Sequence, residues 1–173
     1  MSTAQGRSQA SAHRSPQGEG LALGMQKKPP HLGPLNWRVL LQWLENDHVV
    51  SSEEAARVKA RCSAAESAQH PLLRLGSVSL KRASDGKTLD VELLTQWLAR
   101  RCGLDYLRID PLKVDVGRVA DAMAANYAER HKVLPVQVSP SEIVVATAEP
   151  FVDDWVGEVE RQSRRSVRRV LAN

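Results

Sequence analysis

Gly86-Lys87-Thr88 is the segment of this sequence that most suggests chemistry, because it spells the end of a phosphate-binding P-loop. In that loop successive backbone amides wrap a phosphate, and the lysine reaches its outer oxygens. The loop also needs a glycine five positions before its second glycine, and that position holds Lys81. Asp85 would in addition repel a phosphate. We therefore interpret the segment as a surface turn and expect this polypeptide to lack ATP turnover.

The spacing of the nucleophilic and titratable residues does not indicate a catalytic or metal site. Cys62 and Cys102 are not in C-x-x-C spacing and have no close histidine. The sequence contains no G-x-S-x-G elbow, and its histidines are scattered. The acidic pairs Glu53-Glu54 and Asp153-Asp154 are better explained as partners of helix N-termini than as acid-base dyads. We accordingly expect no catalytic residue, no metal ligand and no cofactor.

A run of arginines near the C-terminus is the densest charge feature outside residues 1–34. The formal net charge is +4, but residues 1–34 hold a surplus of +3, so the remainder is nearly neutral. This balance disfavours nucleic acid as a partner, because nucleic-acid binding needs a dense basic surface. We interpret the run as a solvated rim, with contact to an acidic partner surface or anionic lipid as the alternative. Its members are Arg161, Arg164, Arg165, Arg168 and Arg169.

The composition is ordinary for a globular protein, with 42% hydrophobic and 25% charged residues in a chain of 173. It excludes collagen-like, disulfide-stapled and wholly disordered classes. No apolar run approaches the roughly 18 residues of a membrane-spanning helix, and the N-terminus lacks the apolar region of a signal peptide. We therefore expect a cytoplasmic protein.

The first two regions of the chain predict a tail and a pair of helices. Residues 1–34 are rich in glycine and proline and contain no aromatic residue, which predicts a disordered tail. Residues 35–70 predict a helical hairpin and linker, since an apolar stripe beginning at Trp37 has helical spacing. Ser51 and Glu54 form a capping box for the second helix. The sequence leaves open whether the hairpin packs on the rest of the chain.

Residues 71–173 predict the main domain, which makes the fold class α+β. Its predicted order after the hairpin is α-β-β-α-β, a small three-stranded sheet with helices packed on it. Pro135 cannot donate a backbone hydrogen bond, so its strand is expected at an edge of the sheet. The expected elements are an extended run at 72–80, helices at 90–102 and 116–127, strands at 133–138 and 142–148, a helix at 151–164 and a strand at 166–171.

A family resemblance lies in segments 93–104, 106–115, 127–136, 144–151 and 168–173. Its most specific part is the Ala-Thr-Ala-Glu-Pro block that ends at Pro150, together with Arg130-His131 and Leu134-Pro135-Val136. These residues resemble the N-terminal domain of type II secretion assembly ATPases, the GspE-like proteins. The similarity runs from about Leu35 to Asn173.

The resemblance implies a function in docking. In that family the domain precedes a motor module that carries the Walker A and Walker B motifs, so this chain would be a non-catalytic piece of a bacterial ATPase. The family's domain binds the cytoplasmic domain of the inner-membrane L protein, which implies a location at the inner membrane through that partner. Exposed apolar residues of the hairpin and the basic rim are expected to make the contact: Trp37, Leu41, Trp43, Arg161, Arg165 and Arg168.

A related subset of these domains, the MshEN type, implies an alternative function, because it binds cyclic di-GMP through two tandem segments. Arg74-Leu75-Gly76 resembles the opening of one segment. An arginine there can stack on guanine, and a glycine lets the backbone approach phosphate. The other segment would begin at Val39-Leu40-Leu41, which departs from the pattern. Packing is the competing explanation, with Leu75 in the core and Gly76 in a strand or turn.

Overall fold

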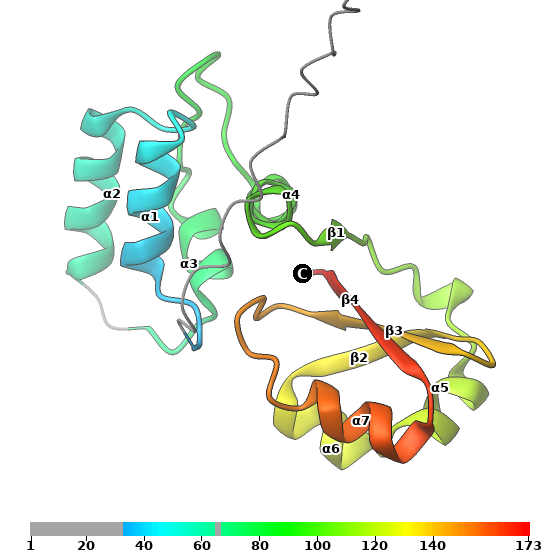
Figure 1. Ribbon diagram of the computed structural model, residues 1–173. Coiled ribbons are helices and arrows are strands. Elements are labelled where there is room, and N and C mark those ends of the chain that lie inside the picture. The colour runs from blue at the N-terminus through cyan, green and yellow to red at the C-terminus, as the bar shows by residue number, and fades with distance from the viewer. Residues whose placement is uncertain (1–32, 65–66) are drawn as a thin grey trace, which may run out of the picture.

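The computed structural model describes residues 33–64 and 67–173. The tail predicted for residues 1–34 therefore lies almost wholly outside the described residues. Figure 1 shows the described elements in two groups, one made of helices and one built on a small sheet. We call residues 35–102 the helical lobe and residues 103–173 the sheet lobe. This mixture of helices with one small sheet confirms the α+β class.

The helical lobe begins with the predicted hairpin, formed by α1 (Trp37–Asn46) and α2 (Ser52–Ser63). Ser51 caps α2 as expected, because its hydroxyl accepts a hydrogen bond from the backbone amide of Glu54 at 3.2 Å. The Glu54 carboxylate reaches forward instead and accepts a hydrogen bond from the backbone amide of Lys81 at 2.6 Å. This bond attaches α2 to a segment that lies 27 residues further along the chain.

The expectation of an extended run at 72–80 is wrong, because its first part is the helix α3 (Pro71–Ser77). Pro71 occupies the first turn, where its missing amide is not needed and its fixed φ suits a helix. Leu72 and Leu75 lie one helical turn apart, and both enter the core. The apolar alternation that suggested a strand therefore reflects two neighbouring positions on one helix face.

Helix α4 (Val91–Cys102) begins and ends at the predicted residues. Asp90 caps it by accepting a hydrogen bond from the Leu93 amide at 2.8 Å. Gly103 ends it in the left-handed conformation, with φ 67°.

Gly76 lies inside α3, so its expected place in a strand or turn is wrong. A Cβ atom on Gly76 would lie 2.5 Å from Val91 Cγ2 and 3.3 Å from the Val91 backbone nitrogen. Both distances are shorter than ordinary van der Waals contact. Glycine is therefore required here by the close approach of α3 to the start of α4.

Replacing Gly76 with alanine is expected to lower the free energy of unfolding by up to about 2 kcal/mol. Forcing an extra methyl group into a packed contact costs about 1–3 kcal/mol, and the better helix propensity of alanine returns about 1 kcal/mol. Urea denaturation measures the difference. Gly117→Ala is the matched control, since a Cβ there would meet only Asp115 Oδ1 at 3.6 Å. A Gly76→Ala variant as stable as the Gly117→Ala variant would contradict the packing explanation.

One hydrophobic core joins all four helices of the helical lobe. Trp37 and Leu41 from α1 share it with Val58 from α2, Leu75 from α3 and Leu98 from α4. The hairpin is therefore packed against α3 and α4, which answers the question that the sequence left open. The core is continuous across the expected domain boundary between residues 70 and 71.

The sheet has four strands in the order β1-β4-β3-β2, where the sequence predicted three. The strands are β1 (Asp105–Tyr106), β2 (Val133–Val138), β3 (Glu142–Thr147) and β4 (Ser166–Leu171). β2 and β3 form the predicted antiparallel hairpin, while β4 is parallel to β3 and β1 is parallel to β4. β2 lies at an edge, as Pro135 predicted. β1 was not predicted, because a strand of two residues is too short to show an alternating apolar and polar pattern.

Three helices and a 3-10 turn, η1 (Pro111–Lys113), complete the sheet lobe. The helix predicted at 116–127 is two helices, α5 (Val116–Ala122) and α6 (Ala125–His131), because Met123 is extended with φ −152°. α7 (Val156–Ser163) begins five residues later than predicted, so Asp153 and Asp154 precede it.

The two faces of the sheet are covered differently. Figure 1 shows α6 and α7 side by side on one face. Trp155, Val159 and Met123 pack there with Ile143 and Val145. The opposite face buries Val144, Ala146, Val170 and Ala172, with Leu107, Ile109 and Val136 packed against them. Among the described residues, every helix is too short or too polar to cross a lipid bilayer.

Candidate docking site

Gly86-Lys87-Thr88 forms an exposed turn whose polar groups bond to one another. The Arg82 guanidinium donates two hydrogen bonds to Asp85, at 2.9 and 2.6 Å, and lowers the pKa of that carboxyl to about 2. Gly86 donates its amide to the Arg82 carbonyl, and the Thr88 hydroxyl accepts a hydrogen bond from Lys81 Nζ at 2.8 Å. This turn, with a carboxylate at its tip, fits the interpretation as surface structure.

The two thiols are packing groups. Cys62 is buried in the core of the helical lobe. Burial raises the pKa of Cys102 to about 11, which keeps that thiol protonated and unreactive at neutral pH. Within residues 33–64 and 67–173, no three histidine, cysteine or acidic side chains lie close enough to hold a metal ion.

The hairpin residues expected to be exposed are mostly part of the core. Trp37 is 6% exposed and Leu41 is 4% exposed, so the expectation of exposure is wrong for both. Their stripe faces α3 and α4, because four helices enclose a core that two helices alone would leave open. The edges of both side chains line a groove of about 290 Å³ between α1 and α2.

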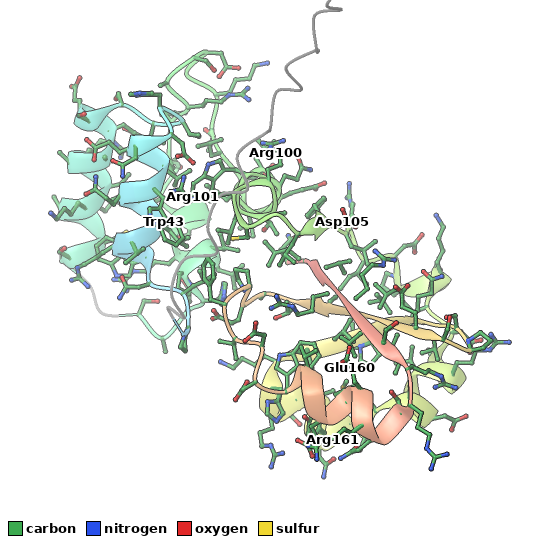
Figure 2. All side chains as sticks on the ribbon, in the orientation of Figure 1. Trp43, Arg100, Arg101, Asp105, Glu160 and Arg161 are labelled. Carbon is green, nitrogen blue, oxygen red and sulfur yellow. The ribbon has the colours of Figure 1, made fainter. Side chains whose placement is uncertain are left out.

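Trp43 lies at the junction of the two lobes, half buried. Its ring meets the ring of Phe151 edge to face at 5.8 Å, and the Arg101 guanidinium lies 4.9 Å from its centre. Figure 2 shows Arg101 and Trp43 near each other, between α4 and α1. Asp47 holds this arrangement by pairing with Arg101 and accepting a hydrogen bond from Trp97 Nε1 at 3.0 Å. Asp47 was missed because it stands in a polar turn without a motif.

Glu149 is a second link between the lobes. Its carboxylate accepts a hydrogen bond from the Leu35 amide at 2.7 Å and lies 3.2 Å from His70 Nε2. Its own amide donates to the Thr147 hydroxyl at 3.0 Å. The Ala-Thr-Ala-Glu-Pro block that carried the resemblance therefore joins the end of β3 to the start of the helical lobe.

The arginine run is divided by the fold. α7 ends at Ser163, and Arg168 lies in β4, where it pairs with Asp105 at 3.3 Å and Glu142 at 3.4 Å. Val167 packs into the core under α7, so its neighbour Arg168 points to the opposite face of the sheet. Arg168 therefore lies in the strand predicted at 166–171, as expected, and is separated from the arginines near α7.

The other two expected arginines remain close to α7. Arg165 lines a cavity of about 520 Å³ between α7 and the α5–α6 connection. Figure 2 shows Arg161 on α7, well away from Trp43 in the other lobe. The structure thus does not bring the six expected contact residues together on one surface.

Arg74, Leu75 and Gly76 serve packing. The Arg74 guanidinium donates to the Cys62 carbonyl at 2.5 Å and lies 5.0 Å from the centre of the Trp37 ring. Leu75 is fully buried, which confirms its expected place in the core. Gly76 faces Val91, as described above. All three residues thus make packing or hydrogen-bond contacts within the helical lobe.

The feature that sequence reasoning missed is an apolar groove of about 570 Å³ in the sheet lobe. Its walls come from α5, α6, β2 and the ends of β3 and β4. Val116 is 69% exposed and Leu134 is 42% exposed, and neither α5 nor α6 contains a fully buried residue. Its charged lining residues are Glu129 and Lys132, one of each sign. The apolar stripe at 116–127 is the sequence feature that could have indicated the groove. It was interpreted instead as the buried face of a helix.

The groove has the properties of a protein-docking surface. Exposed aliphatic side chains that gather in a concave site are typical of interaction surfaces. The groove offers no cluster of catalytic groups, and its two charges cancel. It suits an uncharged, aliphatic segment rather than a nucleotide or a metal ion.

Comparison with known proteins identifies relatives of this chain. The MshEN domain family model matches residues 102–173. The type IV pilus assembly ATPase TfpB of Acinetobacter baylyi (strain ATCC 33305 / BD413 / ADP1) is 42% identical over 92 residues. That match covers 53% of this chain and 16% of TfpB, so the chain matches only a small part of its relative.

A solved structure described as MshE with cdg has a similar fold. Its TM-score is 0.55 at 17% sequence identity, and the match covers 77% of this chain and 88% of that chain. The structure shows that the fold is similar. The two sequence matches confirm the resemblance to the N-terminal region of pilus and secretion assembly ATPases.

Proposed function

We propose, on the premise of this resemblance, that residues 33–173 form a non-catalytic docking module of an assembly ATPase. The module attaches the motor to the cytoplasmic domain of an inner-membrane partner, the L protein in type II secretion systems. The ATPase motor is then another part of a longer parent protein, which is cytoplasmic and held at the inner membrane through this contact. The match to TfpB supports this proposal, because the matched residues make up only 16% of that longer ATPase.

The apolar groove is the observation that carries this proposal. A surface helix of a closed domain normally turns its apolar stripe toward the core. α5 instead presents Val116 to solvent beside Leu134, at an edge of the sheet. Because Val116 is 69% and Leu134 is 42% exposed, covering them with a partner would contribute only part of the value for full burial, about 0.6–2 kcal/mol for each side chain.

Binding of the purified cytoplasmic domain of the L protein, measured by biolayer interferometry, tests the proposal. Val116→Asp and Leu134→Asp are each expected to weaken binding about tenfold or more, because 1.4 kcal/mol corresponds to a factor of ten. Leu73→Asp is the matched control, since Leu73 is also an exposed leucine but lies on α3. Its binding is expected to stay within about twofold of the parent chain.

The same binding measurement tests whether the arginines predicted from the sequence also contribute to the contact. Replacing Arg161 and Arg165 with glutamate would weaken binding of the L protein domain if this basic surface takes part. Circular dichroism of each variant shows that the fold is retained. Undetectable binding by the unmodified chain, or full binding by both groove variants, would reject docking through the groove.

Cyclic di-GMP binding is the second candidate function. The fold similarity to the structure of MshE with cdg favours it, as does the Arg-Leu-Gly triplet that starts at Arg74. The contacts of this triplet oppose it, because Arg74 already donates to the Cys62 carbonyl and Val91 fills the space at Gly76. Calorimetry with cyclic di-GMP decides between the two. Saturable heat that Arg74→Ala abolishes would favour the ligand-binding function.

A further inference from the structure

The apolar groove lies beside the point at which the N-terminal part of the chain joins the described structure. Leu35 donates its amide to Glu149 at 2.7 Å, and Glu149 directly follows Ala148, which lines the groove. Thr147 lines it as well. Whatever precedes Gly33 in the chain therefore starts close to one end of the groove.

The sequence before Gly33 contains one short aliphatic segment. Leu21, Leu23 and Met25 stand at alternate positions within Gly20–Met25, and this segment carries no charge. Apart from them and the three prolines Pro16, Pro29 and Pro30, the only apolar side chains larger than alanine in residues 1–32 are Met1 and Leu32. The segment has the chemistry that the groove suits, namely aliphatic side chains without net charge.

We infer that residues 20–25 of the chain bind in the apolar groove of the sheet lobe and cover Val116 and Leu134. Leu23 precedes Leu35 by twelve residues, which span up to about 40 Å when extended. That reach exceeds what is needed from a starting point at the groove's end. The tether also gives the segment an effective concentration in the millimolar range, so even a weak contact is populated.

This contact makes the N-terminal segment a competitor of any partner that docks in the groove. The competition rests on the proposed function, whereas the contact itself does not. An intramolecular occupant would be displaced only by a partner that binds more tightly than the tethered segment. The N-terminal segment would thereby set a threshold for docking.

Hydrogen exchange of the full chain tests the contact without any partner. The amides of Val119 and Met123 close α5 by bonding to the carbonyls of Asp115 and Val119. Because α5 buries few side chains of its own, its protection depends on what covers it. The double variant Leu21→Asp/Leu23→Asp is expected to exchange these two amides at least threefold faster than the unmodified chain. Ala10→Asp/Ala12→Asp is the matched control in the same region and is expected to change nothing.

A peptide of residues 18–28, labelled with a fluorophore, provides the second measurement. It is expected to bind the Leu21→Asp/Leu23→Asp chain at least fivefold more tightly than the unmodified chain, whose groove is already filled. Val116→Asp in the same chain is expected to abolish peptide binding, and Leu73→Asp to leave it unchanged. These readouts are independent of the L protein, so their failure and the failure of docking are distinguishable.

Three results would overturn the inference. The first is unchanged exchange at Val119 and Met123 in the double variant. The second is protection of these amides that falls on dilution, since this would identify a second copy of the chain as the occupant. The third is equal binding of the peptide by the unmodified chain and the double variant.

Discussion

Replacing Trp155 with alanine is expected to lower the free energy of unfolding by about 3–5 kcal/mol, the cost of a large cavity at a buried aromatic residue. Trp155 is almost fully buried and is the largest such side chain in the described residues. It packs between the sheet and the helices with Ile143, Val145 and Val159. Urea denaturation followed by circular dichroism measures the loss.

The variant Trp155→Phe separates the contribution of ring packing from the contribution of the indole hydrogen bond. Trp155 Nε1 donates to the Val152 carbonyl at 3.0 Å. Phenylalanine keeps most of the packed ring but removes this bond, which contributes about 1 kcal/mol. A loss below about 1 kcal/mol for Trp155→Ala would contradict the assigned role of this side chain.

Leu171→Ala is expected to destabilise both lobes together, by about 2–5 kcal/mol. Leu171 ends β4, is 0% exposed and belongs to the core of the helical lobe. Its carbonyl also accepts a hydrogen bond from the Leu107 amide at 2.9 Å. Removing this side chain opens a cavity at the end of β4, where the sheet meets the core of the helical lobe.

Hydrogen exchange in α4 and β3 measures whether the two lobes lose protection together. Leu112→Ala is the control, because Leu112 is 96% exposed and its truncation is expected to cost less than about 0.5 kcal/mol. Loss of protection confined to β3 would show that Leu171 does not couple the lobes.

The lobes are joined by three kinds of contact, which gives the docking proposal a mechanical basis. Leu171 supplies apolar burial, Trp43 and Phe151 supply an aromatic contact, and Glu149 supplies hydrogen bonding. The two lobes are therefore held together by packed side chains as well as by hydrogen bonds.

Local signals in the sequence correctly predicted much of the fold. Asp90 and Gly103 bound α4, Ser51 caps α2, and Pro135 lies in an edge strand. In each case the outcome depends on the backbone of a few neighbouring residues: a side chain that accepts an amide, a glycine that takes a positive φ, or a missing donor. The Ala-Thr-Ala-Glu-Pro block likewise contributed to the resemblance that the sequence matches support.

Other features depended on contacts between distant parts of the chain. The spacing of Leu72 and Leu75 predicted a strand. In the structure both residues lie on a helix and share one core with residues of α1 and α4. Trp37 and Leu41 were predicted to be exposed, but both are buried in the same core. The strand that holds Arg168 was predicted, but the pairing of Arg168 with Asp105 and Glu142 depends on the neighbouring strands β1 and β3.

The sequence by itself determined the start of α2, both ends of α4, the β2–β3 hairpin, the absence of a complete P-loop motif, and the family resemblance. Only the tertiary structure decided which apolar stripes are covered. The stripe of α1 is enclosed by three other helices, whereas the stripe of α5 borders an open groove. Periodicity shows that a helix has an apolar face, but what lies against that face depends on elements far away in the chain.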